Sequence, residues 1–189
     1  LVLNFMHQLE TLLEREESQE EARISSIKLQ KALVEVQEMA HHDALTNLPN
    51  RRQFELTFKR DIESAKRHHK KLSLLYIDVD NFKSVNDHLG HDVGDLLLSE
   101  VAIRLEASVR KGDFVARLGG DEFAVILSET SEKNAAIVAE KIINHLNKNC
   151  VIAGHEMSIS VSIGISSFIE GGLDYVTLCK NADIAMYKA

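Results

Sequence analysis

The amino-acid sequence predicts an α+β domain in which helices surround a mixed central β-sheet. Segments with helical periodicity alternate with apolar, β-branched runs in the order helix, strand, helix, strand–turn–strand, helix, strand, helix. The chain has 189 residues, of which 44% are hydrophobic and 27% charged. This is enough apolar material for the core of a domain of about 150 residues. Helices packed on the faces of one sheet bury elements that occur in this order.

Residues 1–40 differ from the rest of the chain because they contain no Gly and no Pro. Beyond a charged stretch, EREESQEEAR, the residues Leu29, Leu33, Val36 and Ala40 follow a 4-3-4 spacing that is typical of a coiled-coil seam. We interpret this region as a helical, coiled-coil-like linker from an absent upstream module. A helix packed on its own domain is the alternative. The chain begins with Leu rather than Met, so we expect it to be a piece of a longer protein.

A turn separates this linker from the domain. The segment HHDALTNLPNRRQF contains Pro49, the single proline of the chain, between Asn47 and Asn50. We therefore place the boundary near Ala40, with the domain over 41–189.

The first half of the domain is predicted from periodicity. Residues 51–69 place their apolar side chains on one helical stripe, and LSLLYIDVD, 72–80, is a continuous apolar run typical of a buried strand. Residues 81–94 are polar and include two glycines. Residues 95–109 are again helical, with Asp95 in the first turn, where a carboxylate suits the helix dipole.

The second half contains a hairpin and two further helices. The predicted elements are strands over 114–118 and 123–127 around the turn GGDE, a helix over 131–148, a strand over 156–168 and a last helix over 174–189. Ser131 suits the N-cap of the first of these helices.

Charge and cysteine content favour some functions over others. The formal net charge of −7 argues against a broad nucleic-acid surface, which needs clustered Lys and Arg. No run of about 18 apolar residues is present, and the N-terminus lacks the features of a signal peptide. Cys150 and Cys179 are far apart in the sequence, as in a reduced protein. We expect a cytoplasmic protein with no nucleic-acid partner and no membrane contact in this fragment.

Carboxylates stand at the ends of two predicted strands. Asp78 and Asp80 close the 72–80 strand and point to the same side of it, and Asp121 and Glu122 lie at the hairpin tip. A carboxylate at the end of an apolar strand costs several kcal/mol to desolvate unless a cation or donor compensates it. If the hairpin pairs beside the 72–80 strand, three or four carboxylates converge.

Converging carboxylates are suitable ligands for Mg²⁺. Two such ions would orient a nucleophilic hydroxyl and stabilise a leaving pyrophosphate. Gly119 and Gly120 would let a substrate approach the backbone closely. An ordinary solvated hairpin turn is the alternative for GGDE alone, and the second acidic strand end favours the metal site.

Several motifs together resemble one family. RLGGDEFAVIL is similar to the signature of the GGDEF family of diguanylate cyclases, and DALTNLPNRRQF resembles the family's opening motif, with Asn47 where glycine is more usual. YIDVDNFKSVNDHLGHDVGD, VSIGIS and NADIAMYKA resemble further family segments in the same order. The resemblance covers 41–189. It implies an α+β fold similar to nucleotidyl cyclases and the polymerase palm.

The resemblance also implies an activity. Family members condense two GTP into cyclic di-GMP and two pyrophosphates by two-metal catalysis in a homodimer, since each subunit holds one GTP. A sensory domain is expected upstream. A binding module that senses GTP or cyclic di-GMP without turnover is the alternative, and the intact acidic and glycine positions favour the enzyme.

Site roles carry over from the family position by position. Asp78, the backbone carbonyl of Val79, Asp121 and Glu122 would hold two Mg²⁺ ions, or Mn²⁺ in their place, and Asp121 would help to deprotonate the attacking 3′-hydroxyl. The substrate-binding residues implied are Asn81 and Phe82 through backbone N–H groups, Lys83 through its charge, Asn86 and Asp95 at the guanine edge, and Gly119 and Gly120 beside the nucleotide. Asp80 is expected to have a structural hydrogen-bonding role instead.

A second site is implied by RKGD, residues 110–113, which resembles the family's RxxD inhibitory motif. Arg110 and Asp113 would bind the product cyclic di-GMP, because a guanidinium fork can grip a phosphate or a guanine edge. A surface ion pair of little energetic value is the alternative. The closing helix is expected to be truncated, because the chain stops at Ala189 and Lys188 falls one place before the family's usual lysine.

Overall fold

The computed structural model describes residues 15, 19, 23–30, 41–168 and 173–188. The chain divides into two units, Leu1–Ala40 and His41–Ala189. In the first unit, the described residues are helical. Leu29 is exposed, and the other three residues of the expected coiled-coil seam lie outside the described residues, so the linker stays a prediction.

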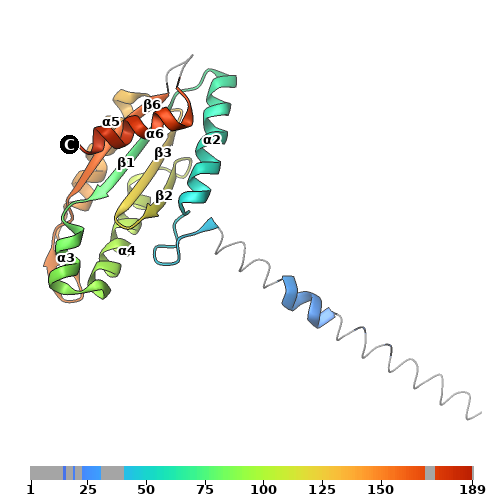
Figure 1. The fold of residues 1–189 in the computed structure, drawn as a ribbon, viewed down its shortest axis with the longest axis horizontal. Coiled ribbons are helices and arrows are strands. Elements are labelled where there is room, and N and C mark those ends of the chain that lie inside the picture. Colours follow the sequence, from blue (N-terminus) through green and yellow to red (C-terminus); the bar gives the residue numbers. More distant parts are fainter. Residues whose placement is uncertain (1–14, 16–18, 20–22, 31–40, 169–172, 189) are drawn as a thin grey trace, which may run out of the picture. The chain divides into compact units, whose positions relative to one another are not determined.

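The second unit contains the domain (Figure 1). Its elements are α2 Arg51–His68, β1 Leu72–Val79, α3 Phe82–Leu89, α4 His91–Ser108, β2 Phe114–Gly119, β3 Glu122–Ser128, α5 Glu132–Leu146, β4 Cys150–Ile152, β5 His155–Met157, β6 Val161–Phe168 and α6 Tyr175–Met186. Ser131 caps α5 as predicted, accepting a hydrogen bond from the Asn134 backbone N–H.

The central sheet has the strand order β2-β3-β1-β6. The α+β class is therefore confirmed, with helices around one sheet. The expectation of a mixed sheet is wrong in one respect, because every adjacent pair of described strands in it is antiparallel. β1 and β2 run in the same direction, but the β2–β3 hairpin places β3 between them. No parallel neighbours result.

The structure contains elements that were not predicted, and some bounds differ: the strand expected over 156–168 begins only at Val161. The polar segment after β1 forms a helix, α3, and α4 starts four residues earlier than expected. Gly90 permits both, since its φ of 90° lets the chain turn sharply between the two helices. The segment before β6 forms the short β4–β5 hairpin, turned by Ala153 and Gly154, both at positive φ.

Helices cover the two faces of the sheet and form two cores. Figure 1 shows α2 and α6 on one face, with α4 and α5 on the other. Side chains alternate along β1, so Leu75 and Ile77 pack in the α4/α5 core while Tyr76 packs in the α2/α6 core. Each fully buried aliphatic side chain contributes about 1.5–3 kcal/mol to folding. By the same alternation, Asp78 faces the α2/α6 side.

Close packing of α6 on β6 generates the first prediction. A Cβ on Gly164 would lie 1.9 Å from the Ala182 carbonyl oxygen and 2.3 Å from the Met186 backbone nitrogen. Backbone atoms cannot rotate away, so Gly164→Ala should lower the free energy of unfolding by about 3 kcal/mol. Urea unfolding measures this. Gly112→Ala is the control, because a Cβ there meets nothing within 4 Å. Equal stability of the two variants would contradict the packing described.

Candidate active site

The antiparallel pairing of β1 with β3 brings the two acidic strand ends together. Asp78 is the cross-strand partner of Glu122. Asp121 precedes Glu122, and its carbonyl oxygen accepts a hydrogen bond from the Val79 backbone N–H at 3.3 Å. The structure therefore gathers at one end of the β1–β3 ladder the four residues that were predicted to hold metal.

Electrostatic repulsion is concentrated on Asp78. Burial, followed by the negative charges of Asp121, Glu122 and Asp80, raises the pKa of Asp78 to about 6. Like charges directly opposite one another destabilise an antiparallel pair. A divalent cation would relieve this repulsion, and the oxygen donors present are those that Mg²⁺ prefers.

The carboxylates do not form a closed metal cage. Within the described ranges, no three His, Cys, Asp or Glu side chains are placed so that they could hold one ion together. Glu122 is instead turned toward Arg51. The carboxylate and carbonyl oxygens present here are suitable ligands for a hard divalent cation. That all four residues bind such an ion together stays a prediction.

Asp80 behaves differently from Asp78. Its two carboxylate oxygens accept hydrogen bonds from the hydroxyls of Ser160 and Ser162, and its backbone N–H donates to the Ser160 carbonyl at 3.0 Å. Asp80 thus ties β1 to the start of β6. These bonds agree with the structural role expected for it.

The turn between β2 and β3 depends on glycine and on Arg117. Gly119 and Gly120 have φ values of 139° and 53°, and a Cβ on either would meet nothing within 4 Å. Backbone conformation therefore requires glycine here, while the surrounding space is open. Arg117 Nε and Nη2 donate to the Gly120 carbonyl at 3.0 and 2.7 Å, and Nη1 pairs with Asp43 at 2.8 Å. Arg117 therefore holds this turn.

The predicted phosphate-binding residues open α3. Asn81 adopts a left-handed conformation, with φ of 58°, and Phe82 and Lys83 form the first turn of the helix. Free backbone N–H groups at a helix N-terminus attract anions. The Lys83 side chain is exposed beside them. This placement suits phosphate.

The predicted guanine-binding residues lie where α3 meets α4. Asn86 Oδ1 is buried without a hydrogen-bond partner. A Cβ on Gly94 would lie 2.0 Å from that atom, so the missing side chain makes room for the Asn86 amide. Asp95 is the next residue on α4 and is exposed. An unpaired buried acceptor beside an exposed carboxylate is suited to a ligand that carries hydrogen-bond donors.

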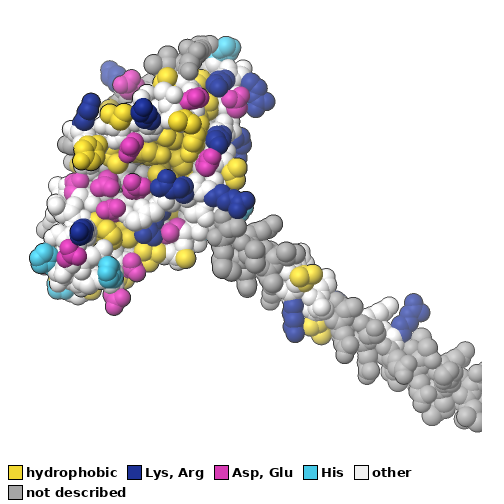
Figure 2. All heavy atoms as spheres, viewed as in Figure 1, with side chains coloured by type: hydrophobic (Ala, Val, Ile, Leu, Met, Phe, Trp, Pro, Cys, Tyr) yellow, Lys and Arg dark blue, Asp and Glu magenta, His cyan; other side chains and the backbone are white. Residues whose placement is uncertain are grey.

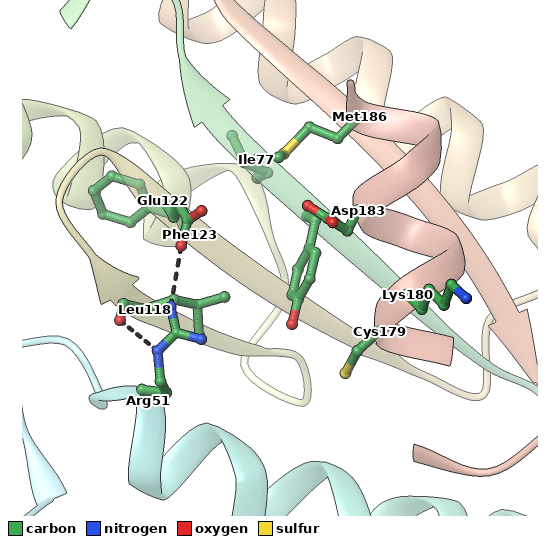
Figure 3. Close-up of a pocket in the computed structure, with 10 residues that line it drawn as sticks. Arg51, Ile77, Leu118, Glu122, Phe123, Cys179, Lys180, Asp183 and Met186 are labelled. Carbon is green, nitrogen blue, oxygen red and sulfur yellow. Dashed lines mark hydrogen bonds and ion pairs between the residues drawn. The ribbon is translucent and has the colours of Figure 1, made fainter. Parts of the chain in front are cut away.

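A cavity of about 380 Å³ adjoins the acidic cluster between α2 and α6 (Figure 3). Tyr76, Leu118 and Phe123 from the sheet, together with Cys179 and Met186 from α6, contribute to its lining. In Figure 2, hydrophobic side chains gather on this face between α6 and α2, bordered by charged groups. The volume is in the range of small-molecule sites.

Arg51 stands at the edge of this cavity and was missed by the sequence analysis. Its Nε donates to the Leu118 carbonyl at 2.9 Å, and Nη2 pairs with Glu122 Oε2 at 3.1 Å. One signal in the sequence was available. Arg51 begins α2, and a cation at that end opposes the helix dipole.

The RxxD residues lie at the other end of the β2–β3 hairpin. Arg110 Nε contacts Asp113 Oδ1 at 3.2 Å, and Nη2 donates to the Ser128 carbonyl. They line an open hollow of about 350 Å³. Since β2 has six residues, roughly 20 Å of strand separates this pair from the GGDE turn.

Together, these features describe an α+β domain whose antiparallel sheet ends in paired carboxylates, with the N-terminus of α3 following β1. A profile described as the GGDEF domain of diguanylate cyclases matches residues 40–189. The chain belongs to this GGDEF family, and the resemblance seen in its motifs is confirmed. Within the described part of the chain, no helix is long and apolar enough to cross a membrane.

Two curated relatives come from Pseudomonas aeruginosa. MucR, named a bifunctional diguanylate cyclase/cyclic di-GMP phosphodiesterase, is 42% identical over 175 residues, which make up 92% of this chain and 26% of that protein. TpbB, named a diguanylate cyclase, is 41% identical over 164 residues, 86% of this chain and 38% of that protein. The chain therefore spans less than two fifths of either relative.

Solved structures agree with the fold. The coiled coil and GGDEF domain of DgcB from Caulobacter crescentus, in complex with c-di-GMP, has a TM-score of 0.83 at 27% identity, covering 91% of this chain and 92% of that one. The GGDEF domain of TpbB has a TM-score of 0.76 at 42% identity, covering 79% of this chain and 88% of that one.

The raised pKa of Asp78 generates the second prediction. Its folded-state value of about 6 exceeds the ordinary 3.8, so the folded protein binds this proton more tightly than the unfolded chain. Stability therefore falls as pH rises from about 4 to 6 and stays lower above that range. Asp78→Asn should stabilise the metal-free protein at pH 7.5, by on the order of 1 kcal/mol after allowance for solvent screening.

Urea unfolding in the presence of a chelator, at pH 7.5 and at pH 4, measures this effect. The difference between Asp78→Asn and the unsubstituted protein should shrink at pH 4. Asp87→Asn, which changes an exposed carboxylate on α3, is the matched control. A less stable Asp78→Asn protein at pH 7.5 would show that the neighbouring carboxylates do not repel Asp78.

Proposed function

We propose that this domain is a diguanylate cyclase, which condenses two GTP molecules into cyclic di-GMP and releases two pyrophosphates. The observation that carries the proposal is the position of Asp78 opposite Glu122, with Asp121 alongside. DosC of Escherichia coli, named a diguanylate cyclase, is 43% identical over 149 residues. NbdA of P. aeruginosa, named a cyclic di-GMP phosphodiesterase, is 33% identical over 172 residues. Names of relatives therefore do not assign the activity by themselves.

Binding of GTP would use the N-terminus of α3 and the contact between α3 and α4. Asn86 and Asp95 offer an amide and a carboxylate to the guanine edge, and adenine would leave these groups unpaired. The N–H groups of Asn81 and Phe82, with the charge of Lys83, would hold the phosphates at the helix N-terminus. Open space around the glycine turn admits the nucleotide between this helix and the acidic cluster.

Chemistry would take place at the end of the β1–β3 ladder. Asp78, the Val79 carbonyl, Asp121 and Glu122 would hold two divalent ions, with Mg²⁺ as the proposed ion and Mn²⁺ as a substitute. When bound, such ions orient the hydroxyl nucleophile and offset the charge of the leaving pyrophosphate. Asp121 would accept the proton of the attacking 3′-hydroxyl.

A homodimer follows from this chemistry. Each domain holds one GTP, so the 3′-hydroxyl on one protomer must face the α-phosphate on the other. One half-site alone cannot close the ring. The linker over residues 1–40, together with a sensory domain upstream, would control how two half-sites meet, in the cytoplasm where GTP is available.

Arg110 and Asp113 would bind the product. The Asp113 carboxylate accepts a hydrogen bond from the Arg110 backbone N–H and also pairs with the Arg110 side chain. The two residues are therefore preorganised. Product bound at this position would inhibit the enzyme without occupying the catalytic cluster.

The third prediction tests the catalytic cluster. Glu122→Gln keeps the size of the side chain but removes its charge, and it should abolish cyclic di-GMP formation from GTP and Mg²⁺. Chromatography of the nucleotides measures the product. Glu156→Gln on β5 is the control, because Glu156 is exposed and lies on the separate β4–β5 hairpin.

The assay should be repeated over a range of protein concentrations. The rate per protomer is expected to rise with concentration until dimers dominate. Full activity of Glu122→Gln would disprove the metal-ligand assignment. Binding of GTP by an unsubstituted protein that forms no product would favour the sensing module instead.

The fourth prediction concerns product inhibition. Arg110→Ala removes the guanidinium from the hollow beside Asp113, so added cyclic di-GMP should no longer slow the reaction, while the initial rate without product stays unchanged. Initial-rate measurements with increasing cyclic di-GMP test this. Lys111→Ala, next to Arg110 on the same hollow, is the control. Undiminished inhibition of Arg110→Ala would place product binding elsewhere.

A further inference from the structure

We propose that Arg51 is a positioning residue for Glu122, an inference that rests on the proposed cyclase function. Figure 3 shows the Arg51 guanidinium reaching from the start of α2 to both strands of the hairpin. It donates to the Leu118 carbonyl at the end of β2 and to Glu122 at the start of β3. One side chain therefore spans the whole glycine turn from outside it.

The position of Arg51 on its helix is the first argument. Arg51 and Arg52 begin α2, and the first turn of this helix contains no acidic residue. Cations at a helix N-terminus are unfavourable, because they face the positive end of the helix dipole. A carboxylate partner from another element offsets this penalty for Arg51, and Glu122 supplies it.

The geometry of the contact is the second argument. Arg51 Nη2 binds Oε2 of Glu122, which leaves Oε1 available to a second partner. The Nε contact with Leu118 fixes the plane of the guanidinium, so its direction toward Glu122 is set as well. A lysine has a single charged atom and cannot make both contacts from one rigid fork.

The charge of the cluster is the third argument. Asp78 lies opposite Glu122 on the paired strands, and Asp121 precedes Glu122, so their like charges repel one another. Without a counter-charge, the Glu122 side chain would turn away into the open space around the turn. Arg51 opposes this by attracting one of its oxygens. The Glu122 and Arg51 side chains are 45% and 61% exposed, so the pair contributes little to global stability and its effect is local.

Groups that orient a metal ligand typically change metal affinity or activity by about 10–100-fold when they are removed. Arg51→Ala should therefore lower kcat by about tenfold or more and raise the Mg²⁺ concentration needed for half-maximal rate. The KM for GTP at saturating Mg²⁺ should change little, and the Tm should stay within a few degrees. Arg51→Lys should recover only part of the rate, because it restores the charge without the fork.

A readout that does not need activity separates this inference from the cyclase proposal. Hydrogen exchange of the backbone amides over 118–122, without nucleotide or metal, should be faster in Arg51→Ala than in the unsubstituted protein. Glu122→Gln should show a similar increase. The double variant should show no more than the larger single effect, because the two residues act through one contact.

Arg52→Ala is the matched control, since Arg52 is the next residue on α2 and is exposed. Initial rates without added product should be unchanged in this variant. If Arg51→Ala matches Arg52→Ala in kcat, in Mg²⁺ dependence and in exchange of the turn, the inference is wrong. A change confined to the KM for GTP would also overturn it, because Arg51 would then bind substrate rather than Glu122. If the unsubstituted protein makes no product, the cyclase proposal fails, and amide exchange still decides the role of Arg51.

Discussion

The antiparallel pairing of β1 with β3 is the constraint on which the candidate site depends. It places Asp78 opposite Glu122 at the end of a ladder whose other residues are mostly buried. A shift of the register by one residue would move one of these carboxylates to the α4/α5 core. The apolar residues of both strands pack into the two cores, and this packing holds the carboxylates in position.

Repulsion between the carboxylates of this cluster lowers the free energy of unfolding of the metal-free protein. The pKa of Asp78 is raised because burial and three neighbouring carboxylates oppose its ionisation. Two arginine side chains, one on each side of the turn, hold the turn and Glu122 in place. Arg117, anchored by Asp43, holds the Gly120 carbonyl, and Arg51 holds Glu122. Asp43 and Arg51 lie near the N-terminus of the domain. The turn is therefore stabilised by residues that are far from it in the sequence.

Most regular elements could be predicted because their signals are local. The stripe of α2, the apolar runs of β1 and β3 and the Ser131 cap each depend on neighbours within a few residues. The helix α3 was not assigned, because it has only eight residues, mostly polar, and its apolar side chains are at most partly buried. The antiparallel sheet was missed because the position of β3 between β1 and β2 is a property of the whole topology.

The sequence by itself predicted the residues of the candidate site other than Arg51, because carboxylates and glycines at strand ends can be recognised from local patterns and from the family motifs. Only the tertiary structure decided how those residues are held. The Arg51–Glu122 contact joins residues 71 positions apart, and the Arg117–Asp43 contact joins residues 74 apart. Such contacts leave no periodic signal, because they form only after the sheet and α2 have packed together.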